Sequence, residues 1–196
     1  KKKFNVFKGS LTNVLSRFTK IIKIYKPTHV IRVTADCPII DSKVLSTYIK
    51  KFKKNDLDTL YFNYPTSLLS GYDIYSSNLL LNADKFSKDR KDKEPVGCFY
   101  VRRNLKKLKT LKVMLPKFLK TNKYKLSIDT MSDFEKIKKL LVIYGKKPIS
   151  IKKILKILEK NSGLIIKHSK ENFSIHNRIL RKIKIDKNKF KDKLYL

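Results

Sequence analysis

The sequence has few cysteines, few glycines, few acidic residues and no long apolar run. Its two cysteines, Cys37 and Cys98, lie far apart in the chain, which argues against a disulfide framework and fits a reducing compartment. Neither has a second cysteine or a histidine at zinc-finger spacing. No apolar stretch approaches the length of a membrane span. We therefore expect a cytoplasmic protein with no membrane span and no structural zinc.

Acidic residues are outnumbered by basic ones. The chain has 48 Lys and Arg against 16 Asp and Glu, a formal net charge of +32. A charge of this size produces non-specific, salt-dependent attraction to polyanions. The lysines are spread along every segment, however, and no RNA-binding aromatic signature accompanies them. We expect no specific nucleic-acid partner, and a basic nucleic-acid-binding module remains the alternative interpretation.

What the chain does contain is one stretch, residues 29–41, that organises the rest. Val30, Ile31 and Val33 are β-branched and apolar, a pattern typical of a strand that is covered on both faces. Pro38 must end this strand, which leaves Asp36 at its carboxyl end, where open α/β sheets bind ligands. Asp36 is either a ligand of Mg²⁺, which prefers oxygen donors, or a plain turn cap.

A second informative stretch is residues 125–135. Residues 126–128 are predicted to form a short strand, and Thr130 or Ser132 then caps a helix whose first turn carries acidic residues. Asp129 stands between the strand and the helix. From the residues alone it is read as the N-cap of that helix.

The remaining pattern alternates strands with amphipathic helices, which predicts an α/β domain. The 196 residues, 41% of them hydrophobic, are enough for one such domain with its own core. Helices are expected up to Tyr25, from Asp41 to about Lys54, and over 77–86, 99–103, 132–144 and 151–160; strands are expected at 59–63 and, as an edge, at 111–115.

The segment Arg-Val-Thr-Ala-Asp-Cys-Pro-Ile-Ile-Asp, residues 32–41, closely resembles the Arg-(Ile/Val)-Thr-Gly-Asp-Cys-Pro-Leu-Ile-Asp signature of cytidylyltransferases of the spore-coat polysaccharide and acylneuraminate type. Residues 126–134 are similar to that family's Leu-Thr-(Ile/Leu/Val)-Asp-Thr-Pro-Glu-Asp-(Leu/Phe) segment. The resemblance implies a Rossmann-like, three-layer nucleotidyltransferase domain. It further implies that Asp36 and Asp129 bind Mg²⁺ and that CTP and a sugar or sugar acid are the substrates. The implied role of this transfer is cell-surface polysaccharide biosynthesis.

The same resemblance suggests four substrate-binding residues: Arg17, Arg32, Asp73 and Glu94. Arg17 keeps its spacing in a Gly-Ser-x-x-x-Val-Leu-x-Arg element, although its position alone favours a solvated helix residue. Asp73 follows the family's Gly-(Leu/Tyr)-Asp pattern and would face the acceptor, with a turn Asp as the alternative. Glu94 aligns with the family, but Pro95 stands where the family has His and cannot replace an imidazole.

The family's opening strand and its Gln-Ala-Arg-x-x-Ser-x-Arg-Leu-Pro-(Gly/Ala)-Lys phosphate loop do not occur in the sequence, and the resemblance covers about residues 6–160. We therefore expect a fragment or a degenerate copy that binds CTP weakly by itself, and a non-catalytic α/β module is a further alternative. Residues 1–163 are predicted to form the partial nucleotidyltransferase-like domain, and 164–196 a basic tail or arm. The sequence does not identify the sugar and leaves the oligomeric state open, a homodimer included.

Overall fold

The computed structural model describes residues 4–62, 68–69, 71–88, 90–121, 123–167 and 193–195. It is a mixed α/β structure, as the sequence predicts. The helices are α1 (Val14–Tyr25), α2 (Ser42–Asn55), α3 (Ser77–Phe86), α4 (Arg90–Lys93), α5 (Cys98–Asn104), α6 (Met131–Tyr144) and α7 (Ile151–Lys160). Short 3₁₀ helices are η1 (Leu105–Lys107), η2 (Lys117–Leu119) and η3 (Ser162–Leu164). The strands are β1 (His29–Val33), β2 (Thr59–Phe62), β3 (Tyr72–Ser76), β4 (Thr110–Met114) and β5 (Lys193–Tyr195).

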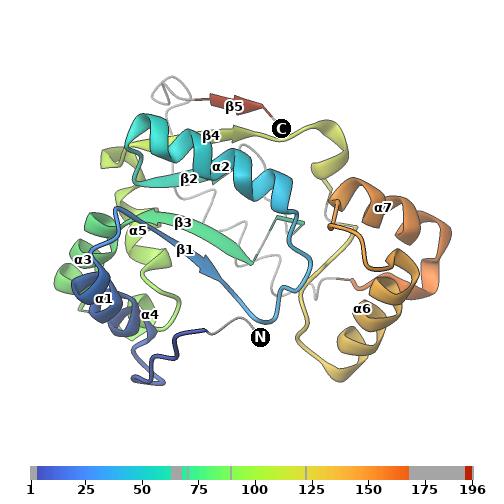
Figure 1. Cartoon of the computed structure of the whole chain (residues 1–196), viewed down its shortest axis with the longest axis horizontal. Coiled ribbons are helices and arrows are strands. Elements are labelled where there is room, and N and C mark those ends of the chain that lie inside the picture. The colour runs from blue at the N-terminus through green and yellow to red at the C-terminus, as the bar shows by residue number, and fades with distance from the viewer. Residues whose placement is uncertain are drawn as a thin grey trace.

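Two small sheets form the middle of the molecule (Figure 1). β1 pairs with β3 in antiparallel register, and β2, β4 and β5 form a parallel sheet in that order. The sheets meet where the Ser76 N–H donates to the Asp58 carbonyl at 2.7 Å. α2 lies across the strands, α1, α3, α4 and α5 gather at one end, and α6 and α7 lie at the other (Figure 1). Segments from both halves of the sequence can therefore meet beside the end of β1.

Helix ends are set by local side chains, which explains why most helices are predictable from the sequence. The Asn13 side chain caps α1 by accepting from the Ser16 N–H, and Asp41 caps α2. Thr130 caps α6 in a reciprocal capping box with Asp133, in which each side chain accepts from the other residue's backbone N–H. The predicted helices around α1, α2, α3, α6 and α7 are confirmed.

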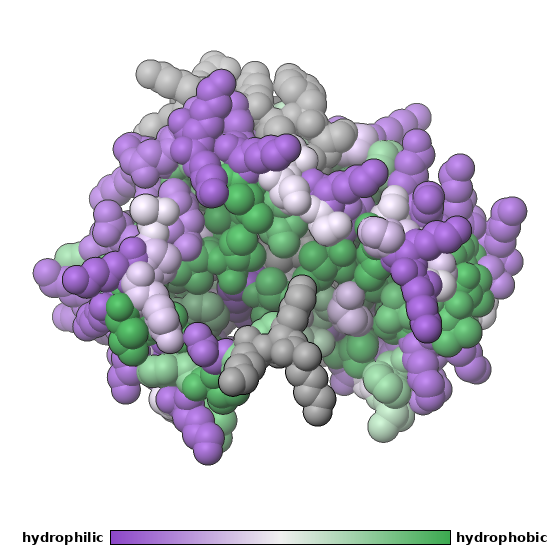
Figure 2. Space-filling model, viewed as in Figure 1, coloured by the Kyte–Doolittle hydropathy of each residue, from purple (hydrophilic) through white to green (hydrophobic). Residues whose placement is uncertain are grey.

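The buried apolar side chains fall into two clusters. The larger joins α2, β2, β4, α6 and α7, and the smaller joins α1, α3 and α5 to one face of β3. Fully buried members of the larger cluster include Tyr48, Phe52, Leu111 and Ile154. Ile166 also belongs to it, so the chain continues to pack beyond α7. Figure 2 shows apolar side chains over the middle of one face of the molecule, with polar side chains around them.

Four details differ from the prediction. The strand at 30–33 is not covered on both faces: Ile31 and Val33, which alternate onto the same face, are 38% and 55% exposed. The stretch 111–115 is not an edge, since β4 lies between β2 and β5. Residues 126–128 are extended but form no strand. β3 was not expected, because its Tyr-Asp-Ile-Tyr-Ser sequence lacks a clear alternation of apolar and polar residues.

The predicted tail is only partly described. Residues 168–192, and with them most of the segment expected to be a basic arm, lie outside the described residues. The domain boundary at residue 163 stays a prediction. Among the described residues, no helix combines the length and the apolar character needed to cross a bilayer.

Candidate functional site

The two predicted metal-binding acids are brought together by the backbone. The Ile128 N–H donates to the Asp36 carbonyl at 2.7 Å, so the turn after β1 lies beside the extended segment that leads into α6 (Figure 1). Both Asp36 and Asp129 are exposed. Two carboxylates that are far apart in the sequence thus occupy adjacent backbone segments and are open to solvent.

Asp129 is held from one side by an ion-pair cluster. The Lys125 Nζ lies 2.5 Å from the Asp129 carboxylate and 2.9 Å from that of Asp133. Asp133 also accepts from the backbone N–H groups of Asp129 and Thr130, at 3.0 and 3.2 Å. The Asp133 carboxylate therefore fixes the backbone that carries Asp129, while the Lys125 ammonium compensates the charge of both acids.

The cluster shifts the pKa values of its members in opposite directions. Burial by itself raises the pKa of Asp133, but hydrogen bonds from Lys125 and from the backbone N–H groups outweigh it and lower that pKa below the ordinary value. Burial by itself lowers the pKa of Lys125, but its hydrogen bonds to Asp129 and Asp133 raise it above the ordinary value. Both groups are therefore more firmly charged at neutral pH than they would be in the unfolded chain.

The turn that carries Asp36 is held by tight backbone packing against Gly71. The Thr34 N–H donates to the Gly71 carbonyl at 2.9 Å, and the Cys37 N–H donates to the Thr34 carbonyl at 3.2 Å. A Cβ on Gly71 would lie 2.1 Å from the Cys37 Cβ, and the φ of Gly71 is +98°. Both the space and the backbone angle require glycine there.

Two of the predicted substrate-binding residues form an ion pair next to this turn. Arg32 on β1 is the register partner of Asp73 on β3, and its Nη1 donates to the Asp73 Oδ2 at 3.0 Å. The Arg32 side chain is 26% and the Asp73 side chain 42% exposed, so both remain accessible. The sequence left open that Asp73 is a turn residue. In the structure Asp73 lies in strand β3.

The oxygen donors present fit the demands of Mg²⁺. That ion usually takes one or two carboxylates together with water and substrate phosphates, and a pair such as Asp36 and Asp129 satisfies this. Within the described residues no group of three or more His, Cys, Asp or Glu side chains gathers in a metal-binding arrangement. A site made by this pair alone would therefore depend on the substrate phosphates for its remaining ligands.

Comparison with known proteins identifies the family. A sequence model whose description is cytidylyltransferase matches residues 1–172, most of the chain. The chain belongs to the cytidylyltransferase family. Cytidylyltransferases are nucleotidyltransferases, so the chain belongs to a family of enzymes.

Individual relatives agree with this assignment. The spore coat polysaccharide biosynthesis protein SpsF of Bacillus subtilis (strain 168) is 29% identical over 163 residues, 82% of this chain and 67% of the relative. An uncharacterized protein of Methanocaldococcus jannaschii is 28% identical over 158 residues, 80% of this chain and 64% of the relative. A cytidylyltransferase structure from Leptospira borgpetersenii has a TM-score of 0.73 at 26% identity, covering 83% of this chain and 69% of that one. The Rossmann-like fold is thus confirmed, over about two thirds of the length of these relatives.

The other two predicted substrate-binding residues, Arg17 and Glu94, are not connected to the acid pair by the hydrogen bonds of the described residues. The aliphatic part of Arg17 packs over Gly9, and its buried Nε has no hydrogen-bond partner among the described residues. Glu94 is exposed in the turn after α4. No hydrogen bond or ion pair found in the described part of the chain connects either residue to Asp36 or Asp129. Their assignment as substrate-binding residues stays a prediction.

Sequence reasoning missed the residues that support Asp129. The residues of this cluster are spaced four apart in the sequence: Lys125, Asp129 and Asp133. Lys125 lies in an extended segment, however, so the helical spacing does not predict that the three side chains meet. The three side chains meet because the chain turns sharply at Thr130 into α6. The sequence signal that could have predicted this cluster is one basic residue followed by two acidic residues at equal spacing.

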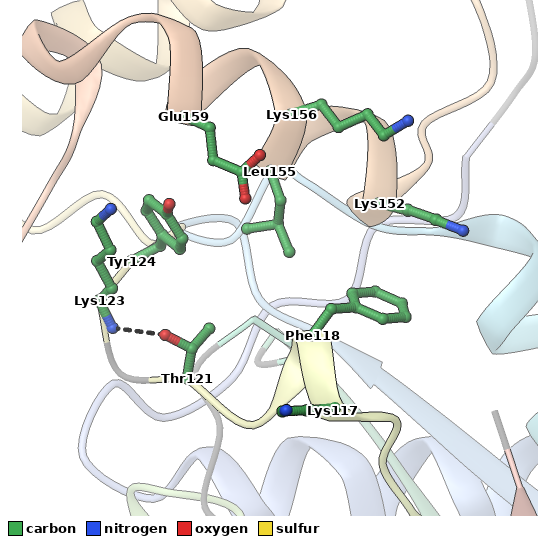
Figure 3. A pocket seen from close by; sticks show the side chains of 9 residues that line it. All are labelled: Lys117, Phe118, Thr121, Lys123, Tyr124, Lys152, Leu155, Lys156 and Glu159. Atoms are coloured by element: carbon green, nitrogen blue, oxygen red, sulfur yellow. Dashed lines mark hydrogen bonds between the residues drawn. The ribbon is translucent and has the colours of Figure 1, made fainter.

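Two concave surfaces are lined by other residues than the predicted site residues. In one pocket, of about 440 Å³, Leu155 points from α7 into the space between Phe118 and Tyr124 (Figure 3). Four lysines, Thr121 and Glu159 complete its wall, and none of the predicted site residues lines it. An apolar groove of about 660 Å³ runs along α6 and begins at Pro38 and Ile128. Neither surface contains a carboxylate of the acid pair.

Proposed function

We propose that this chain supplies the metal-binding and acceptor-binding residues for the transfer of a cytidylyl group from CTP to an oxygen of a sugar or sugar acid, and that the product serves polysaccharide biosynthesis. The observation that carries the proposal is the hydrogen bond from the Ile128 N–H to the Asp36 carbonyl, which puts Asp36 beside Asp129. The name of the Bacillus subtilis relative, a spore coat polysaccharide biosynthesis protein, supports the proposed pathway. Neither Cys37 nor Cys98 forms a disulfide within the described residues, which supports the proposed location in the reducing cytoplasm.

The proposed reaction forms a bond between the acceptor oxygen and the α-phosphorus of CTP and breaks the bond to the leaving pyrophosphate. Asp36 and Asp129 would hold Mg²⁺. When bound, Mg²⁺ would neutralise phosphate charge during the transfer. The ion pair with Lys125 orients the Asp129 carboxylate before the substrates arrive. Catalysis of this kind depends on positioning and charge neutralisation and needs no covalent enzyme intermediate.

The ion pair of Arg32 and Asp73 is suited to orienting the acceptor. The Oδ2 of Asp73 accepts from Arg32, which leaves its other oxygen available for a sugar hydroxyl. Because Arg32 fixes the Asp73 carboxylate, the sugar hydroxyl would donate to an oxygen that is already in position. Arg32 lies on β1, the strand that leads directly to Asp36, so a sugar held by this pair would lie next to the acids.

Metal binding by the acid pair tests this proposal directly. Mn²⁺ would be titrated against the chain and followed by its electron paramagnetic resonance signal. We expect Asp36→Asn and Asp129→Asn each to weaken Mn²⁺ binding at least about tenfold, because each removes a charged oxygen ligand. Asp56→Asn is the matched control, since Asp56 is an exposed acid paired only with the exposed Lys109, and it should leave the affinity unchanged. Equal Mn²⁺ affinity in all four proteins would refute the proposed site.

A further inference from the structure

The pocket beside α7 is built from two segments of the chain that only the folded molecule brings together (Figure 3). One segment is α7 itself, whose lining residues are spaced three, four and seven apart and therefore share one face of the helix: Lys152, Leu155, Lys156 and Glu159. The other segment is η2 with the residues that follow it: Lys117, Phe118, Thr121, Lys123 and Tyr124. The volume of about 440 Å³ lies in the range of small-molecule sites.

The floor of this pocket is apolar and well packed. Leu155 is 6% and Tyr124 5% exposed, and both belong to the larger apolar cluster. Phe118, in contrast, is 45% exposed in the pocket wall. A ligand in the pocket would therefore meet one accessible aromatic ring above a floor that the core holds in place.

The rim of the pocket is cationic, with four ammonium groups against one carboxylate. The Lys152 Nζ lies 6.0 Å from the centre of the Phe118 ring, and the Lys123 Nζ lies 5.3 Å from the centre of the Tyr124 ring. Among the described residues, no ion pair involves any of the four lysines or Glu159. A bound anion would relieve the mutual repulsion of these ammonium groups.

We propose that this pocket binds a nucleoside phosphate, with the base on the Phe118 ring and the phosphate among the lysines. Any base can stack on an aromatic ring, and lysine ammonium groups bind phosphate oxygens. The Glu159 carboxylate accepts hydrogen bonds from hydroxyl and amino groups, which a nucleoside carries and a fatty acyl chain lacks. The inference goes beyond the proposed function and does not depend on it, because neither Asp36 nor Asp129 lines the pocket.

Titration of AMP against the full chain, with EDTA present and followed by NMR chemical shifts, tests the proposal. Adenosine, ribose 5-phosphate and dodecyl phosphate would be titrated separately. We expect AMP to bind more tightly than the other three, because it alone presents both a base and a phosphate. The methyl resonances of Leu155 and Thr121 should shift on addition of AMP. Absence of AMP binding, or AMP binding that leaves these resonances unchanged, would overturn the proposal, and tighter binding of dodecyl phosphate would assign the pocket to a lipid phosphate instead.

Replacement of Phe118 by leucine isolates the contribution of the aromatic ring. Phe118→Leu keeps an apolar side chain and should weaken AMP binding at least about fivefold, the lower end of what stacking of one base contributes. Ribose 5-phosphate, which has no base, should bind as before. Phe134→Leu is the matched control, since Phe134 is also 45% exposed but does not line this pocket. The same loss of AMP affinity in both variants would contradict stacking on Phe118.

Replacement of two rim lysines isolates the contribution of charge. The double substitution Lys152→Gln and Lys156→Gln should weaken binding of AMP and of ribose 5-phosphate about tenfold, because each exposed ion pair contributes about threefold. Adenosine binding should not change. The double substitution Lys153→Gln and Lys160→Gln is the control, since it removes the same charge from exposed positions of α7 outside the pocket. An equal loss in the control would mean that only the net charge attracts AMP, and the proposal would be wrong.

The outcome is separable from the fate of the acid pair. Asp36→Asn and Asp129→Asn should leave AMP binding in EDTA unchanged, even if Mn²⁺ titration shows that these acids bind no metal. Loss of AMP binding in either variant would place the nucleotide at the acid pair and overturn the proposal. If a substitution in the pocket lowers the melting temperature, the resonance shifts of Leu155 and Thr121 in the unsubstituted chain decide where AMP binds.

Discussion

Replacement of Asp133 by alanine should destabilise the chain more than any other change to a single acidic side chain at the start of α6. The Asp133 carboxylate accepts from Lys125, Asp129 and Thr130, and its side chain is 11% exposed. Loss of a helix cap costs about 1 kcal/mol, and loss of a hydrogen bond to a charged group about 1.5–3 kcal/mol. Since Lys125 keeps its contact with Asp129, we expect a total near 2–3 kcal/mol.

Urea unfolding at pH 7, followed by circular dichroism, measures this difference. Glu135→Ala is the control in the same helical turn: Glu135 is half-exposed and lies 3.9 Å from Lys138, so its loss should change the free energy of unfolding by less than about 0.5 kcal/mol. A destabilisation by Asp133→Ala no larger than that of Glu135→Ala would refute the reasoning.

The pH dependence of the same difference provides an independent check. Folding lowers the pKa of Asp133, so its contribution to stability is complete above its ordinary pKa of about 4. The contribution is lost as the pH falls through the lower pKa of the folded state. The difference in free energy of unfolding between the unsubstituted chain and Asp133→Ala should therefore be constant from pH 7 to 5 and shrink below pH 4. If this difference in the free energy of unfolding does not change with pH, the charge of the Asp133 carboxylate does not contribute to stability.

Three further predictions concern the packing around the site and its activity. Gly71→Ala should lower the free energy of unfolding by more than about 2 kcal/mol, because the added Cβ would overlap Cys37. Gly163→Ala is the control and should change the free energy of unfolding by less than about 1 kcal/mol, because no atom lies within 4 Å of the added Cβ. Thermal denaturation measures both changes. Asp41→Ala should cost about 2–3 kcal/mol in urea unfolding, because Asp41 caps α2 and also accepts from the buried Ile151 N–H at 3.1 Å; a loss below about 1 kcal/mol would contradict this. The chain by itself should bind CTP weakly and release no pyrophosphate from it, since the family's phosphate loop does not occur in the sequence; magnesium-dependent pyrophosphate release in a coupled phosphate assay would contradict this expectation.

Helices and their boundaries were predictable because their signals are local. Asp41 before an amphipathic run, and Thr130 three residues before Asp133, satisfy backbone N–H groups within the same turn. Nothing elsewhere in the chain is needed to form these contacts. The candidate acids Asp36 and Asp129 could also be chosen from the sequence, because each stands within a short motif of the cytidylyltransferase family.

Strand pairing was not predictable in the same way. Which edges meet depends on backbone groups that every residue carries, so local sequence does not encode the partner. No local pattern indicates that β3 pairs with β1, although that pairing puts Arg32 opposite Asp73. For the same reason the exposure of Ile31 and Val33 could not be read from their apolar character.

The sequence by itself determined the family, the α/β class, most helix ends and the choice of Asp36 and Asp129 as candidate acids. Only the tertiary structure decided that Asp36 and Asp129 lie beside each other, through the Ile128 N–H, and that Lys125 and Asp133 hold Asp129 in place. The physical reason is that caps and periodicity act over a few residues, whereas a site is made by contacts between segments that only the folded chain brings together.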